Sequence, residues 1–227
     1  MSDIDAAKYN TVTFDCYGTL IDWEKGILEF LQPLLEGYDV HVIDEFVLEA
    51  YSELEPLAQD EGGSYKQVLA KVLQRLGSRL AFTPSDEQLT AFSRSIEAWQ
   101  PFPDTIAALQ QLSEHFELAI LSNIDNDLLA YSTKQLQVPF AHTITAEQVG
   151  VYKPDAKMFE EAGRRVVGPV LHVAQSRFHD IVPATALGLE TVWINRSSAG
   201  AAKPVDADPT WTFDSLQNFV DAVRFGP

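Results

Sequence analysis

Short apolar runs alternate with amphipathic stretches over two parts of the chain, residues 9–20 and 102–227. Short runs rich in β-branched and large apolar residues are typical of buried strands, and amphipathic stretches between them are typical of helices that connect parallel strands. The pattern therefore predicts an α/β fold. Strands are expected at residues 11–16, 118–122, 142–145, 170–174 and 191–195, and a further edge strand is a candidate at 210–213.

Residues from about 22 to 100 show helical periodicity alone. Apolar residues spaced three or four apart form one stripe within residues 46–57 and a second within residues 68–80. Ser85 followed by Gln88 forms a capping box that begins a third helix. The sequence thus predicts a Rossmann-like, doubly wound parallel sheet (residues 1–21 and 101–227) with a helical domain (residues 22–100) inserted after the first strand. A Ser- and Ala-rich run at residues 197–204 is expected to be a surface loop.

Charge and cysteine content narrow the class of partner. The 227 residues include 33 acidic and 16 basic side chains, a net charge of −17, and no basic stripe, so neither a nucleic acid nor an anionic membrane is expected as a partner. Cys16 is the single cysteine, which excludes an intramolecular disulfide and a cysteine metal cluster. The amino-terminal segment lacks a secretory pattern, and no apolar run is long enough to span a bilayer. We therefore expect a cytoplasmic enzyme or binding protein.

Polar side chains gather where the predicted strands end. Asp15 follows the first strand, Ser122 and Asn123 the second, Lys153 lies in the loop after the third, and Asp180 follows the fourth. Ligands of doubly wound sheets bind outside the carboxyl ends of the strands. Any one of these residues alone would most simply be a helix cap or turn residue, but the set predicts a site that combines carboxylates, a hydroxyl and an ammonium.

Four motifs carry a family resemblance that extends over nearly the whole chain. They are DCYGTL at 15–20, LSN at 121–123, VYKPD at 151–155, and a fourth that ends at Asp180, thirteen residues before WINR at 193–196. With these motifs the chain resembles the haloacid dehalogenase superfamily. The forms DCYGTL, VYKPD and WINR are most similar to its L-2-haloacid dehalogenase (type II) branch. The resemblance implies that residues 22–100 form the cap domain of that family.

The resemblance also implies a covalent mechanism without a cofactor. Asp15 would attack the carbon that bears the halogen, and water would then hydrolyse the aspartyl ester. Lys153 would keep Asp15 ionised, and Asp180 would orient Lys153 and the water. Thr19 and Ser122 would bind the nucleophile or the substrate carboxylate, although Ser122 with Asn123 could instead cap the next helix.

Two positions separate this chain from the phosphatases of the superfamily. Those enzymes carry a second Asp two residues after the nucleophile, where this chain has Tyr17, a poor acid at its ordinary pKa near 10. They also hold Mg²⁺ with carboxylates of the fourth motif, where one is replaced here by Gln175. A halide leaves without a proton, so both changes favour a dehalogenase, and no metal site is predicted.

The residues expected to bind substrate differ from the family pattern. The cap arginine of characterised relatives has no counterpart in residues 41–47, and Phe159 stands where those relatives have Tyr. Arg177 replaces an Asn and could grip a carboxylate through two parallel hydrogen bonds, or could instead pair with Glu147 or Asp155. Trp23 either lines the pocket mouth or packs the base of the cap. The predicted substrate-binding residues are Tyr17, Asn123, Arg177, Ser176 and Trp23.

Several functions remain open at this level. The leading prediction is a hydrolytic dehalogenase of small 2-haloalkanoic acids that yields the 2-hydroxy acid and halide. It competes with a hydrolase acting at the same carbon on another substrate, such as a strained-ring amino acid, with a Mg²⁺-dependent phosphatase, and with a binding protein without turnover. The expected partner is a small carboxylate, and a homodimer is a candidate assembly.

Overall fold

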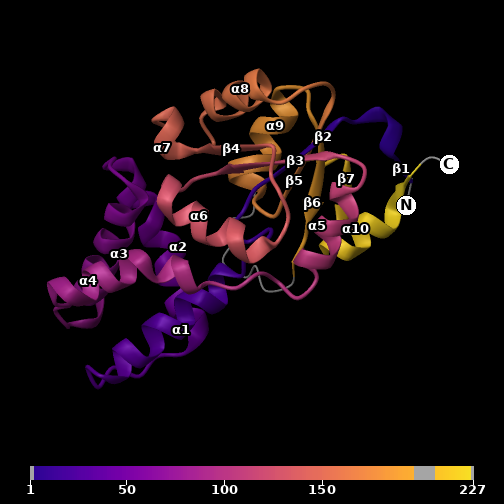
Figure 1. Cartoon of the computed structure of the whole chain (residues 1–227). Helices are drawn as coiled ribbons and strands as arrows, with labels where there is room; N and C mark the ends of the chain where they lie inside the picture. Colours follow the sequence, from indigo (N-terminus) through magenta and orange to yellow (C-terminus); the bar gives the residue numbers. More distant parts are fainter. Residues whose placement is uncertain (1–2, 197–207, 226–227) are drawn as a thin grey trace.

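A six-stranded, all-parallel sheet forms the centre of the computed structural model, which describes residues 3–196 and 208–225. Its strand order is β4-β3-β2-β5-β6-β7 (Figure 1). The chain therefore builds outward from central β2 on one side and then crosses over to β5 on the other. The strands are β2 (Thr11–Phe14), β3 (Glu117–Ser122), β4 (His142–Thr145), β5 (Val170–Ala174), β6 (Glu190–Ile194) and β7 (Trp211–Phe213). This architecture confirms the predicted α/β class, and the edge-strand candidate corresponds to β7.

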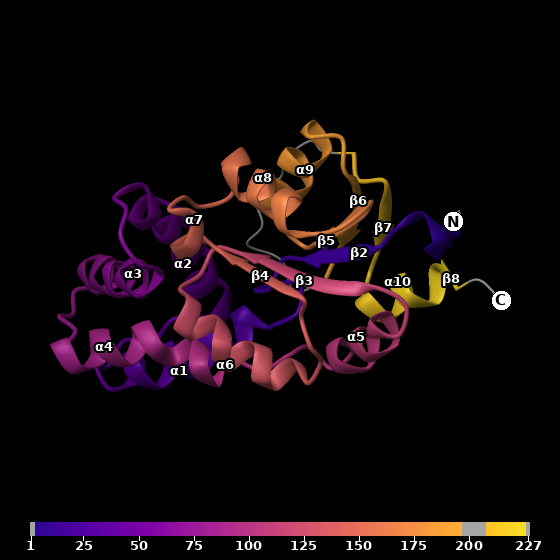
Figure 2. The same ribbon diagram turned by 45° about the horizontal axis from the view of Figure 1, so that its top comes forward.

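Helices cover both faces of the sheet (Figure 2). On one face lie α8 (Ala156–Arg165) and α9 (Val182–Ala186), and on the other lie α5 (Thr105–Ser113), α6 (Asn126–Leu136) and α10 (Leu216–Ala222). The shorter α7 (Ala146–Val149) follows β4, and the π-helical turn η3 (Arg177–Ile181) joins β5 to α9. Central strands covered on both faces are mainly apolar, and Val12, Phe14, Ile120 and Val173 are fully buried.

The first strand is shorter than predicted. β2 ends at Phe14, not at Cys16, because the chain turns away from the sheet after Asp15. The Asp15 N–H still donates to the Val173 carbonyl at 3.1 Å, but the Cys16 carbonyl accepts from Leu20 and Ile21 in a tight turn. Gly18 has a φ of +96° in that turn, a conformation that glycine adopts without steric cost. The turn is what places the Asp15 side chain at the end of the strand. The predicted loop at 197–204 lies outside the described residues.

Residues 22–100 fold as a layer of helices, here called the helical insert. It contains α1 (Trp23–Glu36), α2 (Asp44–Asp60), α3 (Tyr65–Leu80), α4 (Asp86–Arg94) and the 3-10 turn η2 (Ser95–Ala98). The predicted capping box at Ser85 and Gln88 begins α4, and Ser64 with Gln67 forms another at α3. The apolar stripes of α2 and α3 are largely buried, but Leu57 is 55% exposed, and the first stripe continues instead at buried Ala58.

The two connections of the helical insert run side by side. The Asp22 N–H donates to the Gln100 carbonyl at 2.9 Å, and the Phe102 N–H donates to the Leu20 carbonyl at 3.1 Å. Figures 1 and 2 place α1–α4 beyond one end of the sheet. The chain ends meet elsewhere, where β1 (Ile4–Asp5) and β8 (Val223–Arg224) pair in parallel beside the short turn η1 (Ala6–Lys8). None of the described helices is long and apolar enough to cross a membrane.

Candidate active site

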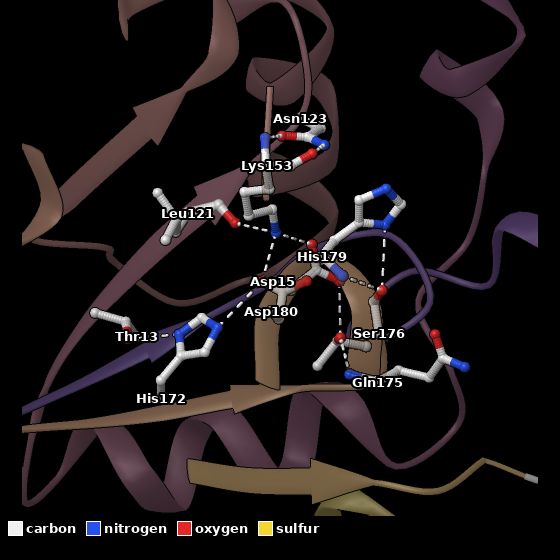
Figure 3. A network of polar contacts seen from close by, with 11 residues as sticks. Thr13, Asp15, Leu121, Asn123, Lys153, His172, Gln175, Ser176, His179 and Asp180 are labelled. Carbon is white, nitrogen blue, oxygen red and sulfur yellow. Dashed lines mark hydrogen bonds and ion pairs between the residues drawn. The ribbon is translucent and has the colours of Figure 1, made fainter. Parts of the chain in front are cut away.

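A buried lysine connects three elements at the carboxyl end of the sheet. The Lys153 ammonium donates to Asp15 Oδ1 at 2.8 Å, to Asp180 Oδ1 at 2.7 Å and to the Leu121 carbonyl at 2.9 Å (Figure 3). These contacts use all three protons of the ammonium. The lysine side chain is 1% exposed, so bulk water does not compete for these contacts. The structure thus brings together Asp15, Lys153 and Asp180 as the sequence predicted.

The backbone of Lys153 is held by Asn123. The Asn123 amide oxygen accepts from the Lys153 N–H at 2.6 Å, and its amide nitrogen donates to the Lys153 carbonyl at 3.1 Å (Figure 3). This pair of hydrogen bonds aligns the loop after α7 with the end of β3. Asn123 was predicted to bind substrate, and the structure places its side chain on this loop. Ser122 lies buried beside it, and no hydrogen bond joins its hydroxyl to Asp15 within the described part of the chain.

Thr19 supports the other oxygen of Asp15. Its hydroxyl donates to Asp15 Oδ2 at 2.9 Å and accepts from the Gln175 N–H at 2.9 Å. Arg196, which follows β6, donates to the Thr19 carbonyl from Nη2 at 2.9 Å and forms an ion pair with Asp104 at 3.1 Å. The sequence motif that includes Arg196 carried the family resemblance, but this bracing of the Thr19 turn was not predicted.

A second buried pair, on the neighbouring strands, supports Asp180. His172 Nε2 lies 3.1 Å from Asp180 Oδ1, and His172 Nδ1 lies 2.9 Å from the Thr13 hydroxyl (Figure 3). The carboxylate accepts, so this geometry assigns the ring proton to Nε2 and makes Nδ1 the acceptor of the Thr13 hydroxyl. Sequence analysis missed His172. The available signal was a polar residue inside each of two apolar runs, since Thr13 and His172 are register partners in β2 and β5.

Burial and charge act against each other in this cluster. Burial raises the pKa of Asp15, the Lys153 ammonium works against that rise, and the charge of Asp180 adds to it. Burial also acts upward on Asp180, but Lys153 and His172 outweigh it and hold its pKa below the usual range. For Lys153, burial favours the neutral amine, yet the two carboxylates raise its pKa overall. Of the two carboxylates that contact the ammonium, Asp180 is therefore the more acidic and Asp15 the more basic.

One oxygen of this cluster receives no hydrogen bond from the described residues. It is Asp180 Oδ2, which is buried. A buried carboxylate oxygen without a donor is costly unless another molecule supplies one. This oxygen is an acceptor at which a bound water molecule can be held.

The donor set does not fit the magnesium site of a phosphatase. In residues 3–196 and 208–225 no group of three or more His, Cys, Asp or Glu side chains is arranged to hold a metal ion. Asp15 and Asp180 both bind the Lys153 ammonium, and the neighbouring position holds the neutral amide of Gln175. A hard divalent cation requires several oxygen ligands with negative charge among them.

A cavity of about 170 Å³ lies between the helical insert and the α/β core. Four of the five predicted substrate-binding residues line it, namely Tyr17, Trp23, Ser176 and Arg177, whereas Asn123 does not. Gln175 also lines it and links it through Thr19 to Asp15. A wider groove of about 750 Å³ shares the walls Pro56, Phe178 and His179 and reaches Lys153. Its remaining lining comes from 59–64, 125 and 146–155.

Aromatic rings form much of the cavity wall. The Trp23 and Tyr51 rings lie 5.4 Å apart, and Tyr17 meets the Trp99 ring edge-on at 5.8 Å. Tyr17 also hydrogen-bonds Ser132 of α6 at 2.9 Å. Burial raises the pKa of Tyr17 further above its usual range. Trp23 therefore lines the pocket and packs within the insert at once.

Arg177 faces the same cavity from the core side. Its guanidinium carbon lies 4.8 Å from the centre of the Trp193 ring. Glu147 and Asp155, the acids that the sequence offered as alternative partners of Arg177, each accept a hydrogen bond from a backbone N–H. Glu147 accepts from the Asn126 N–H at 2.6 Å, and Asp155 caps α8 through the Lys157 N–H at 2.9 Å. The stacked guanidinium is a cation built into the wall of the cavity.

Comparison with known proteins identifies the family. The family model for haloacid dehalogenase-like hydrolases matches residues 9–174, and the chain belongs to that family. An (S)-2-haloacid dehalogenase of Pseudomonas fluorescens is 27% identical over 89% of this chain and 91% of its own length. A glyceraldehyde 3-phosphate phosphatase of Methanopyrus kandleri is 28% identical over 78% and 79%. The L-2-haloacid dehalogenase structure from Xanthobacter autotrophicus superposes with a TM-score of 0.79 at 20% identity, covering 93% and 97% of the two chains.

Proposed function

We propose that this hydrolase displaces a substituent from the carbon next to a carboxylate, with a small 2-haloalkanoic acid as the leading substrate. The observation that carries the proposal is the Asp15 carboxylate, bound on one oxygen by Lys153 and on the other by Thr19. The residue two positions further on is Tyr17, not a carboxylic acid. This site has a strong nucleophile and no acid matched to an alkoxide leaving group, which suits a halide.

The first step forms an ester on Asp15. A carboxylate oxygen of Asp15 bonds to the α-carbon, the carbon–halogen bond breaks, and the halide leaves with the bonding electrons. The Lys153 ammonium acts against the effect of burial on the pKa of Asp15 and so favours the ionised carboxylate that attacks. Arg177 in the cavity wall is the proposed partner of the substrate carboxylate.

The second step regenerates Asp15. Water attacks the side-chain carbonyl carbon of the ester, and the bond between that carbon and the alkyl oxygen breaks. One proton of the water ends on the hydroxyl oxygen of the 2-hydroxy acid, and the other is released to solvent as Asp15 returns to its carboxylate form. Asp180 Oδ2 is the proposed acceptor for the hydrolytic water. Lys153 stabilises the oxyanion that develops on Asp15, because it already donates to Oδ1. In this scheme the helical insert acts as a cap over the cavity.

A magnesium-dependent phosphatase is the competing function, and similarity to the Methanopyrus kandleri phosphatase supports it. Opening of a strained-ring amino acid at the same carbon, and ligand binding without turnover, also compete with the dehalogenase. An activity panel separates these functions. We expect wild-type enzyme to release chloride from (S)-2-chloropropanoate equally well with and without EDTA and to leave p-nitrophenyl phosphate intact. Phosphate release that collapses with EDTA and returns with Mg²⁺ would instead establish the phosphatase.

Isotope labelling tests the covalent step directly. In a single turnover in heavy-oxygen water with enzyme in excess, the label is expected in the Asp15 carboxylate and not in the hydroxy acid. Label found in the first-turnover product would show that water attacks the substrate itself. Asp15→Asn is the matched variant, since it keeps the shape of the side chain and removes the nucleophilic oxygen.

A further inference from the structure

An acidic side chain in the cavity has no role in the proposed chemistry. Glu24, in the first turn of α1, is 8% exposed and lines the cavity. Its Oε1 is buried, and no group among the described residues donates a hydrogen bond to it. An acid in the first turn can stabilise a helix from the solvent, so the helix does not require this burial. A buried carboxylate oxygen that no described residue pairs with is an acceptor that a ligand entering the cavity can use.

The surroundings of Glu24 suit a cation. Trp23 and Tyr51 present a ring pair beside it, Trp99 closes another wall, and Glu55 adds a second carboxylate to the lining. Aromatic faces next to carboxylates are the usual environment of a bound ammonium group. Burial, with a smaller contribution from Asp22, raises the pKa of Glu24 to about 7.

The position of the Trp99 ring is fixed. The ring packs directly on Gly26 of α1, where an added Cβ would lie 2.2 Å from Trp99 Cδ1. Trp99 is 3% exposed, and its indole Nε1 is buried without a hydrogen-bond acceptor among the described residues. The cavity therefore presents an unused donor and an unused acceptor on fixed side chains.

The charges of the cavity are divided between its two walls. Glu24 and Glu55 lie on the helical insert, and Arg177 lies on the core side. An occupant with a carboxylate at one end and an ammonium at the other would match both walls. Such an occupant would also offset the negative charge that the insert contributes.

We propose that the cavity selects substrates in which the carboxylate that binds Arg177 is accompanied by a positively charged amino group, and that Glu24 is the residue that recognises it. This inference rests on the proposed function for the reacting carbon. It assigns the substrate class, an amino-substituted 2-haloalkanoic acid or a zwitterion of the same size. It also assigns a specificity role to a side chain outside the family motifs.

Two isosteric product analogues test this without requiring turnover. Isoserine (3-amino-2-hydroxypropanoate) and 2-hydroxybutanoate differ only in an ammonium against a methyl group. By calorimetric titration at pH 7.5 we expect wild-type enzyme to bind isoserine about tenfold or more tightly than 2-hydroxybutanoate. Glu24→Gln should reduce that preference to about twofold or less. Glu29→Gln, an exposed change on the same helix, should retain the full preference.

Equal or weaker binding of isoserine by the wild type, or a preference that Glu24→Gln leaves intact, would overturn the inference. Turnover of 2-chlorobutanoate by the same preparation, measured as chloride release, separates this failure from failure of the proposed function. Turnover without an isoserine preference would contradict only the role proposed for Glu24. An isoserine preference without chloride release would support the ammonium site and contradict the proposed dehalogenase activity.

Discussion

Buried acids on the two sides of the cavity are treated in opposite ways. Asp15 and Asp180, here called the paired acids, share the Lys153 ammonium at 2.8 and 2.7 Å, and Thr19 and His172 donate to them as well. Glu24 on the helical insert is also buried, but no Lys, Arg or His of the described residues forms an ion pair with it. The paired acids have their cation within the chain, whereas Glu24 leaves a place for one.

The difference separates acids that take part in the reaction from an acid that recognises a ligand. A carboxylate that must react in every turnover needs a fixed position and a stable charge, and surrounding it with donors inside the fold supplies both. A carboxylate that recognises a ligand must leave its hydrogen-bonding capacity unused until the ligand arrives. Leaving it unused lowers the stability of the free protein, which is common at functional sites.

Removing the cation of the paired acids should have the largest effect. Lys153→Met leaves two buried carboxylates without their shared ammonium, so we expect the free energy of unfolding to fall by about 3–5 kcal/mol. Chloride release should fall to background. Urea unfolding followed by circular dichroism measures the first effect. Lys157→Met, an exposed change, is the control. A Lys153→Met protein as stable as wild type would show that the two carboxylates do not depend on the ammonium.

Replacing Glu24 should change the free energy of unfolding in the opposite direction. The raised pKa of Glu24, about 7, means that the folded state binds its proton more tightly than the unfolded state. Stability is therefore lost as the pH rises from the ordinary carboxyl value through about 7, and Glu24→Gln should remove that loss. We expect the variant to be more stable than wild type by on the order of 2 kcal/mol at about pH 8 and no more stable at about pH 4.

Thermal unfolding at a series of pH values measures this difference, with Glu29→Gln as the control. A constant offset between Glu24→Gln and wild type across the pH range would mean that Glu24 is already paired in the free protein.

Replacing Arg177, on the core side of the cavity, should have a smaller effect, and the effect is on substrate binding. Arg177→Lys keeps the charge but loses the stacked, two-pronged guanidinium, so KM for (S)-2-chloropropanoate should rise about tenfold, or about 1.4 kcal/mol, with kcat nearly unchanged. Arg164→Lys, on an exposed face of α8, should leave KM as it is. An unchanged KM in Arg177→Lys would show that Arg177 does not bind the substrate carboxylate. The acids Glu24 and Glu55 on the other side of the cavity would then have no cationic counterpart in substrate binding.

The smallest effect is expected at the histidine that supports the paired acids. Thr13→Val preserves the shape of the side chain but removes the hydroxyl partner of His172 Nδ1. We expect the free energy of unfolding to fall by about 1 kcal/mol, because one buried acceptor loses its donor. Thr212→Val on the exposed side of β7 is the control, and equal stability losses in the two variants would show that the His172 pairing contributes nothing.

The sequence by itself determined the framework. Apolar runs located the central strands to within a residue or two, since strands covered on both faces are mainly apolar. The helical periodicity of residues 22–100 separated the insert, and the motifs brought Asp15, Lys153 and Asp180 into one hypothesis. These signals are local, because each depends on a short stretch of residues.

Only the tertiary structure decided which polar groups are paired. Lys153 and Asp15 are 138 positions apart, and Thr13 and His172 are 159 apart, so no local pattern shows that they touch. Glu24 reads in the sequence as an ordinary first-turn acid. Tyr51 and Trp99 line the same cavity as Glu24, and only the fold brings them there from positions 27 and 75 residues further along the chain. Burial and pairing are properties of contacts between residues distant in the sequence, and these contacts exist only once the chain has folded.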